Sequence, residues 1–144
     1  VGTEWLDDVL LDTGAEVTLY HPERVSQTAV VLHEERRGDE TLATKGCVAA
    51  EDTLEERLAE ATRLSEAQWN GTVGPEYIHG ISAHKIPIKV ISTLEVGDGG
   101  TEGVSHIRAV AYADLNCSLL IGCDVLRMWG AIIDVTSGRL LTRH

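Results

Sequence analysis

The sequence predicts a single, mainly β domain. Many short apolar runs are separated by turn-forming residues, and only one long stretch has the apolar spacing of a helix. The chain has 144 residues, enough for one hydrophobic core but not two. Its hydrophobic content of 43% is typical of a globular protein. We therefore interpret residues 1–144 as one domain.

The first predicted elements surround an Asp-Thr-Gly sequence. A strand over residues 5–11 feeds this turn, and a second strand over residues 17–20 leaves it. His21-Pro22 breaks the pattern, and residues 30–32 form another short strand. The composition then becomes polar and charged, which indicates a surface loop over residues 33–44.

One surface helix is predicted after this loop. Thr53 and Glu56 fit a capping box, and Asn70-Gly71 is a suitable stop. Polar residues cover the face opposite an apolar stripe, so the helix should lie on the surface of the body. Together, about residues 33–72 form a loop and helical insert. The stripe that predicts the helix comprises Leu54, Leu58, Ala61 and Leu64.

The rest of the chain is predicted to be strands, a short helix and a terminal hairpin. Strands are expected over residues 77–81, 86–96 and 104–112, with a Gly-rich hairpin loop over residues 97–103. A buried strand over residues 119–121 leads into a helix over residues 125–129, which Asp124 caps and Gly130 ends. Residues 131–135 and 139–141 then flank the turn Thr136-Ser137-Gly138.

Composition excludes several classes of function. A net charge of -11 repels phosphate backbones, so no nucleic-acid partner is expected. No apolar run reaches the roughly 20 residues of a membrane span, and no signal-peptide pattern opens the sequence. The three cysteines show no C-x-x-C spacing and the histidines no ligand spacing, so neither a disulfide framework nor a metal site is predicted. We expect reduced thiols, an intracellular, cytoplasmic location and no cofactor.

Two motifs carry the candidate chemistry. Asp12-Thr13-Gly14 directly follows the apolar run Val9-Leu10-Leu11, so a buried strand delivers a carboxylate into a tight turn. A second, different signature is an apolar run followed by Gly-x-Asp, in Leu119-Leu120-Ile121-Gly122-Cys123-Asp124-Val125-Leu126. Peptide hydrolysis by carboxylates needs two that share a proton, one as base toward water and one as acid toward the carbonyl. Because the sequence has one Asp-Thr-Gly, a homodimer should supply the second carboxylate.

The two motifs and the order of strands between them resemble those of the retropepsins, the aspartic proteases of retroviruses, retrotransposons and their cellular relatives. The resemblance covers most of the chain outside about residues 33–72. It implies a closed β-barrel, the acid-protease half, with a short C-terminal helix. It also implies that Asp12 is the catalytic aspartate, that Thr13 bonds to the partner chain, and that the Gly14 backbone holds the carboxylate.

The resemblance also implies a substrate cleft for an extended peptide. In the family, a β-hairpin flap closes over the substrate, and its best match here is the segment 78–83 with Gly80 near the tip. The side chains that would contact substrate come from the flap, from the turn and from the loop 113–115. They are Ile78, Gly80, Ile81, Ser82, Ala15, Glu16 and Leu115.

Three features depart from the family pattern. Eleven residues precede Asp12, so the N-terminal strand that retroviral members use for dimerisation has no counterpart in this sequence. Either terminal residues are missing or the dimer is held otherwise, for example by the terminal hairpin over residues 132–141. Cys123 stands where retroviral members have an arginine, and the helical insert is additional.

The sequence therefore predicts an aspartic endopeptidase that acts as a homodimer and processes a polyprotein. The alternative is a catalytically silent retropepsin-like domain that dimerises or binds peptides. The intact Asp12-Thr13-Gly14 favours the enzyme, and the missing N-terminal strand favours the alternative.

Overall fold

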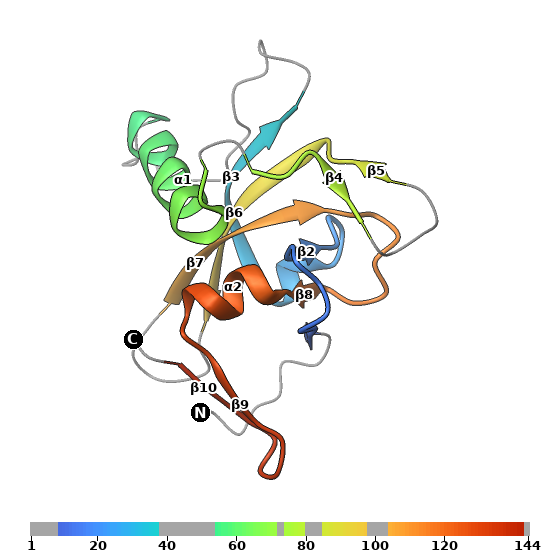
Figure 1. Ribbon diagram of the computed structural model, residues 1–144. Coiled ribbons are helices and arrows are strands. Elements are labelled where there is room, and N and C mark those ends of the chain that lie inside the picture. The colour runs from blue at the N-terminus through green and yellow to red at the C-terminus, as the bar shows by residue number, and fades with distance from the viewer. Residues whose placement is uncertain (1–8, 38–53, 72–73, 80–84, 98–103, 143–144) are drawn as a thin grey trace.

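A computed structural model describes residues 9–37, 54–71, 74–79, 85–97 and 104–142. A mixed six-stranded sheet, flanked by two helices, forms its centre (Figure 1). The sheet has the order β1-β8-β2-β7-β6-β3, with β1 and β3 at its edges. Its strands are β1 (Val9–Leu11), β2 (Leu19–Tyr20), β3 (Ala29–Arg36), β6 (Val90–Gly97), β7 (Val104–Ala111) and β8 (Leu119–Ile121).

The prediction of a mainly β domain is confirmed, but the closed barrel is wrong for the described residues. The edge strands β1 and β3 do not pair with each other, so the sheet stays open. Parallel pairing joins β1 to β8 and β2 to β7, while β2 runs antiparallel to β8. The short strand β2 therefore lies between β8 and β7. Together, β8 and β2 separate the edge strand β1 from the long strands β7 and β6.

The strand β3 is longer than the sequence predicted. The sequence predicts a surface loop from His33, whereas β3 continues to Arg36 and pairs with β6 on both sides of an irregularity between Val31 and His33. His33 is buried, and Glu35 bonds to the buried Arg108 of β7. Polar residues can occupy this strand because hydrogen-bond partners meet them there. Arg108 of β7, two strands away in the sheet, bonds to Glu35, and Glu35 of β3 itself bonds to His33. Composition along the chain cannot reveal such pairing.

The helix α1 (Leu54–Trp69) is confirmed within one residue of its predicted end. Asn70 adopts a left-handed conformation with φ 58°, which ends the helix. The predicted apolar stripe is only half right, because Leu54 and Leu58 are exposed. The helix packs on β7, α2 and β3. Its buried face comprises Ala61, Leu64, Ser65 and Gln68, so the inner face turns polar toward its C-terminal end.

The remaining elements follow the prediction with shifted bounds. The expected strand over residues 86–96 divides into β5 (Ile86–Pro87), which pairs with β4 (Tyr77–Ile78), and β6. The helix α2 (Cys123–Met128) begins two residues earlier than predicted, and Gly130 ends it with φ 60°. The Gly-rich loop lies largely outside the described residues.

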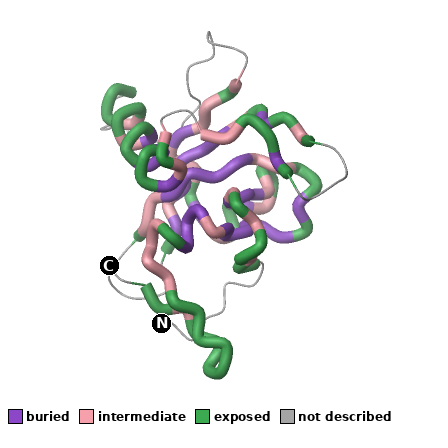
Figure 2. The backbone as a smooth tube through the Cα atoms, in the orientation of Figure 1, coloured by how far each residue is buried: buried purple, intermediate pink, exposed green. Residues whose placement is uncertain are grey.

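A terminal hairpin follows α2, formed by β9 (Ile132–Asp134) and β10 (Arg139–Leu141). It projects away from the body of the sheet, and its backbone is exposed along almost its whole length (Figures 1 and 2). Several large apolar side chains are exposed on it: Ile132, Ile133, Val135 and Leu141. The hairpin therefore contributes little to the core of its own chain.

The core lies on both faces of the sheet. One cluster contains Leu94, Ile107, Leu119 and Val125, and it packs α2 against the long strands. A second cluster contains Leu19, Ile91, Val110 and Leu120 beneath the Asp-Thr-Gly turn. Buried segments run through the centre of the sheet and into α2, as the purple tube in Figure 2 shows.

Candidate active site

The Asp-Thr-Gly turn (residues 12–15) leaves the sheet at the end of β1. The Asp12 N–H still donates to the carbonyl of Ile121 in β8, at 2.9 Å. The Gly14 N–H donates to Asp12 Oδ1 at 2.9 Å, and the Ala15 N–H donates to the Asp12 carbonyl at 3.1 Å. A Cβ at Gly14 would lie 3.2 Å from that same Oδ1. The turn therefore presents a partly exposed carboxylate that its own backbone orients.

The second motif is hydrogen-bonded to this turn. Because β1 and β8 pair in parallel, Leu11 lies opposite Ile121. The two strands therefore end at the same edge of the sheet. The Cys123 N–H donates to the Ala15 carbonyl at 2.7 Å. The Cys123 thiol donates to the Thr13 carbonyl at 2.9 Å. The two motifs, more than a hundred residues apart in sequence, thus form one structure.

Asp124 is the buried centre of this structure and does not cap α2 as predicted. Gly122 is the N-cap residue, and Asp124 lies in the first turn with its side chain 1% exposed. Its Oδ1 accepts the Thr18 hydroxyl at 2.7 Å and the Val125 N–H at 2.8 Å. Its Oδ2 accepts the Thr18 N–H at 3.0 Å. Two further donors reach Oδ2 from the end of α1.

The predicted substrate residues fall into three groups: residues at a buried cluster, one exposed residue and three residues outside the described part of the chain. Ile78 and Leu115 are buried in the second core cluster, and Ala15 of the turn packs against that cluster. In this chain they therefore support the site from inside. Glu16 is exposed beside the turn. Gly80, Ile81 and Ser82 lie outside the described residues, as does the tip of the predicted flap.

Two short antiparallel strands, β4 and β5, lie on either side of the predicted flap segment 78–83. Tyr77 of β4 pairs with Pro87 of β5, and Ile78 pairs with Ile86. The Lys85 ammonium lies 5.5 Å from the centroid of the Tyr77 ring, a cation–π contact across the hairpin. β4 and β5 thus flank the segment predicted as the flap, most of which lies outside the described residues.

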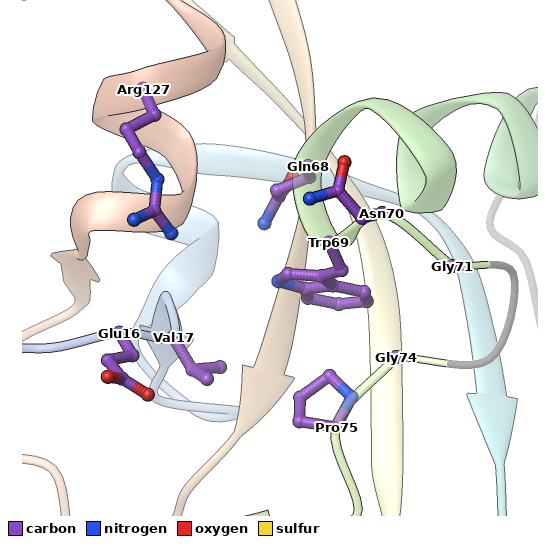
Figure 3. A pocket seen from close by; sticks show the side chains of 9 residues that line it. All are labelled: Glu16, Val17, Gln68, Trp69, Asn70, Gly71, Gly74, Pro75 and Arg127. Carbon is purple, nitrogen blue, oxygen red and sulfur yellow. The ribbon is translucent and has the colours of Figure 1, made fainter.

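An open pocket of about 530 Å³ begins at Glu16 and Val17, next to the turn. Trp69 and Gln68 project into it from the last turn of α1, and Pro75 lies below the indole (Figure 3). Arg127 reaches toward Glu16 from α2 on the opposite side. The pocket combines an aromatic ring with one charge of each sign.

A second polar cluster lies on the far side of β7. Arg108, 2% exposed, donates to Glu35 Oε2 and to the Thr93 hydroxyl, both at 2.8 Å. His33 Nε2 lies 3.1 Å from Glu35 Oε1. Burial alone would raise the pKa of Glu35, but the His33 hydrogen bond and the Arg108 charge outweigh it and hold that pKa below its ordinary value. Arg108 and His33 are buried and both bond to the partly exposed Glu35 within the sheet, so we assign this cluster to the fold.

The described residues offer no group of three or more His, Cys, Asp or Glu side chains that could hold a metal ion. Within the same residues, neither helix is long and apolar enough to cross a membrane. No protein-family model matches the chain, and a search of curated proteins finds no relative. The assignment of the candidate site therefore rests on its geometry.

Sequence reasoning missed the residues that frame the turn. The sequence analysis assigns no role in the site to Thr18, Gln68 or Trp69, yet all three bond to Asp124. One sequence signal points to Gln68. It continues the helical spacing of Ala61 and Leu64, which places a polar side chain on the buried face of the helix.

Proposed function

We propose that this protein is a retropepsin-like aspartic endopeptidase. The observation that carries the proposal is the joint structure of the two motifs. A carboxylate at the end of β1 is oriented by the Gly14 N–H, and the turn beneath it is bonded to the Gly-x-Asp turn (residues 122–124) at Cys123. The geometry presents Asp12 toward solvent while its backbone is fixed to the sheet.

The chemistry requires a second carboxylate. We propose that it is Asp12 of a second copy, which would place the shared site on the two-fold axis of a homodimer. One carboxylate then takes a proton from water as the oxygen attacks the scissile carbonyl, and the other donates a proton to the carbonyl oxygen. The tetrahedral intermediate collapses when the amide nitrogen is protonated.

Two exposed surfaces of the chain support dimerisation. The edge strand β1 exposes Leu10 by 47% and Leu11 by 39%, directly before Asp12. The terminal hairpin exposes Ile133 and its apolar neighbours away from the body. Apolar edges and hairpins of this kind add strands to a second copy, which removes both the apolar area and the free edge from water.

We propose an extended peptide, such as a segment of a polyprotein, as substrate. It would lie across the Asp-Thr-Gly turn and beneath the β4–β5 hairpin. A peptide in this place can add as a strand, with alternate side chains entering pockets. The pocket beside Glu16 would receive residues at some distance from the scissile bond.

The test combines a peptide library with sedimentation. Wild type and Asp12→Asn are incubated with the library between pH 3 and 8, and cleavage is read by mass spectrometry. We expect cleavage by a wild-type dimer and at least a thousandfold loss in an Asp12→Asn dimer, on the order expected when an acid–base group is removed. A wild-type dimer that cleaves nothing would support the silent binding domain instead, and equal cleavage by both proteins would exclude Asp12.

A further inference from the structure

The last turn of α1 supplies hydrogen bonds to the buried Asp124. Gln68 Nε2 donates to Asp124 Oδ2 at 2.9 Å, and Trp69 Nε1 donates to the same oxygen at 2.8 Å. The other donors come from Thr18 and Val125, close to the two motifs. A buried carboxylate is costly unless hydrogen bonds compensate its charge. The insert therefore completes the environment of this charge.

The same carboxylate is connected to the Asp-Thr-Gly turn by short hydrogen bonds. Thr18 Oγ1, which donates to Asp124, also accepts the Gly122 N–H at 3.0 Å. The neighbouring Cys123 N–H donates to the Ala15 carbonyl at 2.7 Å. A displacement of Asp124 would therefore move both ends of the segment 15–18 that follows the turn.

Both donor side chains from α1 are held on two sides. Gln68 Nε2 also donates to the Arg108 carbonyl at 2.6 Å, and Gln68 Oε1 accepts the Arg108 N–H at 2.9 Å. The indole of Trp69 lies against Gly74, where a Cβ would come within 2.7 Å of Cζ3. Gly74 has φ 76°, so only glycine suits this contact. The two side chains thus form fixed supports between β7, the segment at Gly74 and Asp124.

We propose that Gln68 and Trp69 are positioning residues for Asp12, so that the helical insert is part of the active-site frame. This inference rests on the proposed function. Loss of either donor leaves the charge of Asp124 under-compensated, and Thr18 and the Gly-x-Asp turn relax with it. The carboxylate of Asp12 then departs from its productive geometry, which affects the transition state more than substrate binding.

The principal variant is Trp69→Phe, which removes the N–H and keeps an aromatic ring. The control is Leu64→Ala, which removes packing from the same buried face of α1 and makes no hydrogen bond to Asp124. We expect Trp69→Phe to lower kcat about tenfold with KM changed less than about twofold. Leu64→Ala, although it lowers the melting temperature at least as much, should leave kcat within about twofold.

A double-mutant cycle with Asp124→Asn tests whether Trp69 acts through Asp124. The asparagine has no charge to compensate, so Trp69→Phe should change kcat less than about twofold in that background. A tenfold loss in both backgrounds would overturn the route through Asp124. An equal fall of kcat in Leu64→Ala would also overturn the proposal, because the effect would then be general loss of packing.

Hydrogen exchange separates this proposal from the proposed function. The amides of Asp12 and Cys123 donate from one motif to the other, and the Gly122 amide donates to the Thr18 hydroxyl. Their protection can be measured whether or not the protein cleaves peptides. We expect Trp69→Phe to lower their protection about tenfold relative to Ile107 in the core. If the wild type is inactive but this loss occurs, the proposed function fails and the mechanical coupling stands. Unchanged protection in Trp69→Phe would overturn the coupling itself.

Discussion

Gly122 lies where β8 meets α2, and the absence of a side chain there allows the segment after Asp12 to pass close by. A Cβ at this position would lie 2.9 Å from the Ala15 carbonyl oxygen and 3.0 Å from both the carbonyl carbon and oxygen of Val17. All three are backbone atoms, which cannot rotate away as a flexible side chain does. Gly122 has a φ of -94° and a ψ of -178°, a backbone conformation that any residue can adopt. The effect of Gly122→Ala is therefore steric.

The expected loss of stability in Gly122→Ala follows from the displacement of the backbone that faces the new Cβ. The segment 15–17 has to retreat until these contacts reach the ordinary 3.4 Å, which lengthens the bond from the Cys123 N–H to Ala15. Overpacking of this kind costs about 1–3 kcal/mol, and a weakened hydrogen bond adds about 0.5–1.5 kcal/mol. The reduced freedom of the unfolded chain returns about 0.4–1 kcal/mol. We expect Gly122→Ala to lower the free energy of unfolding by about 2–3 kcal/mol.

Urea unfolding measures this loss, with Gly97→Ala as the control. A Cβ at Gly97 meets nothing within 4 Å, and the residue lies at the end of β6. The same substitution there should be neutral or should stabilise the fold by up to about 1 kcal/mol. The two variants are thus expected to differ in sign. If Gly122→Ala unfolds at the same urea concentration as Gly97→Ala, the close approach of Gly122 to the backbone of residues 15–17 is contradicted.

Two further variants test the internal charge and the dimer. Because the pKa of Glu35 is held below the ordinary value of about 4.3, its ionised form stabilises the fold fully above that pH. This contribution is lost as pH falls through the lowered pKa, so Glu35→Gln should flatten the acid side of stability measured by urea unfolding. It should also cost about 1–3 kcal/mol at pH 7, because buried Arg108 loses its carboxylate partner while Glu35 itself is 37% exposed; parallel pH profiles would contradict this. Ile133→Lys on the terminal hairpin should leave unfolding within about 0.5 kcal/mol but shift sedimentation toward monomer. An undiminished dimer would exclude the hairpin as its interface.

Local signals in the sequence located most elements of this fold. The helix over residues 54–69 has apolar spacing and a stop at Asn70, whose left-handed conformation ends it. The strand over residues 119–121 is a short, fully apolar run, and the structure places it inside the sheet. In these cases the chain near each element contains the information that fixes it.

Long-range pairing explains where sequence reasoning failed. The continuation of β3 past His33 depends on Arg108, which is 73 residues away from its partner Glu35. The polar inner face of α1 depends on Asp124, 56 residues beyond Gln68. The Asp-Thr-Gly turn could be predicted because its key contact, from Gly14 to Asp12, spans two residues. The frame around it could not, because its hydrogen bonds join distant parts of the chain.

These distant bonds form one continuous polar path through the domain. Glu35 bonds to the Arg108 side chain, Gln68 bonds to the Arg108 backbone and to Asp124, and Asp124 bonds to Thr18 beside the turn. Apolar side chains of similar volume would often be as stable at such positions. They would also tolerate sliding of one element past another, whereas each hydrogen bond here fixes two groups in direction as well as distance. We infer that this polar path sets the relative position of α1, β7 and the turn, and the proposed two-carboxylate site would need that position to be held to within about 0.5 Å.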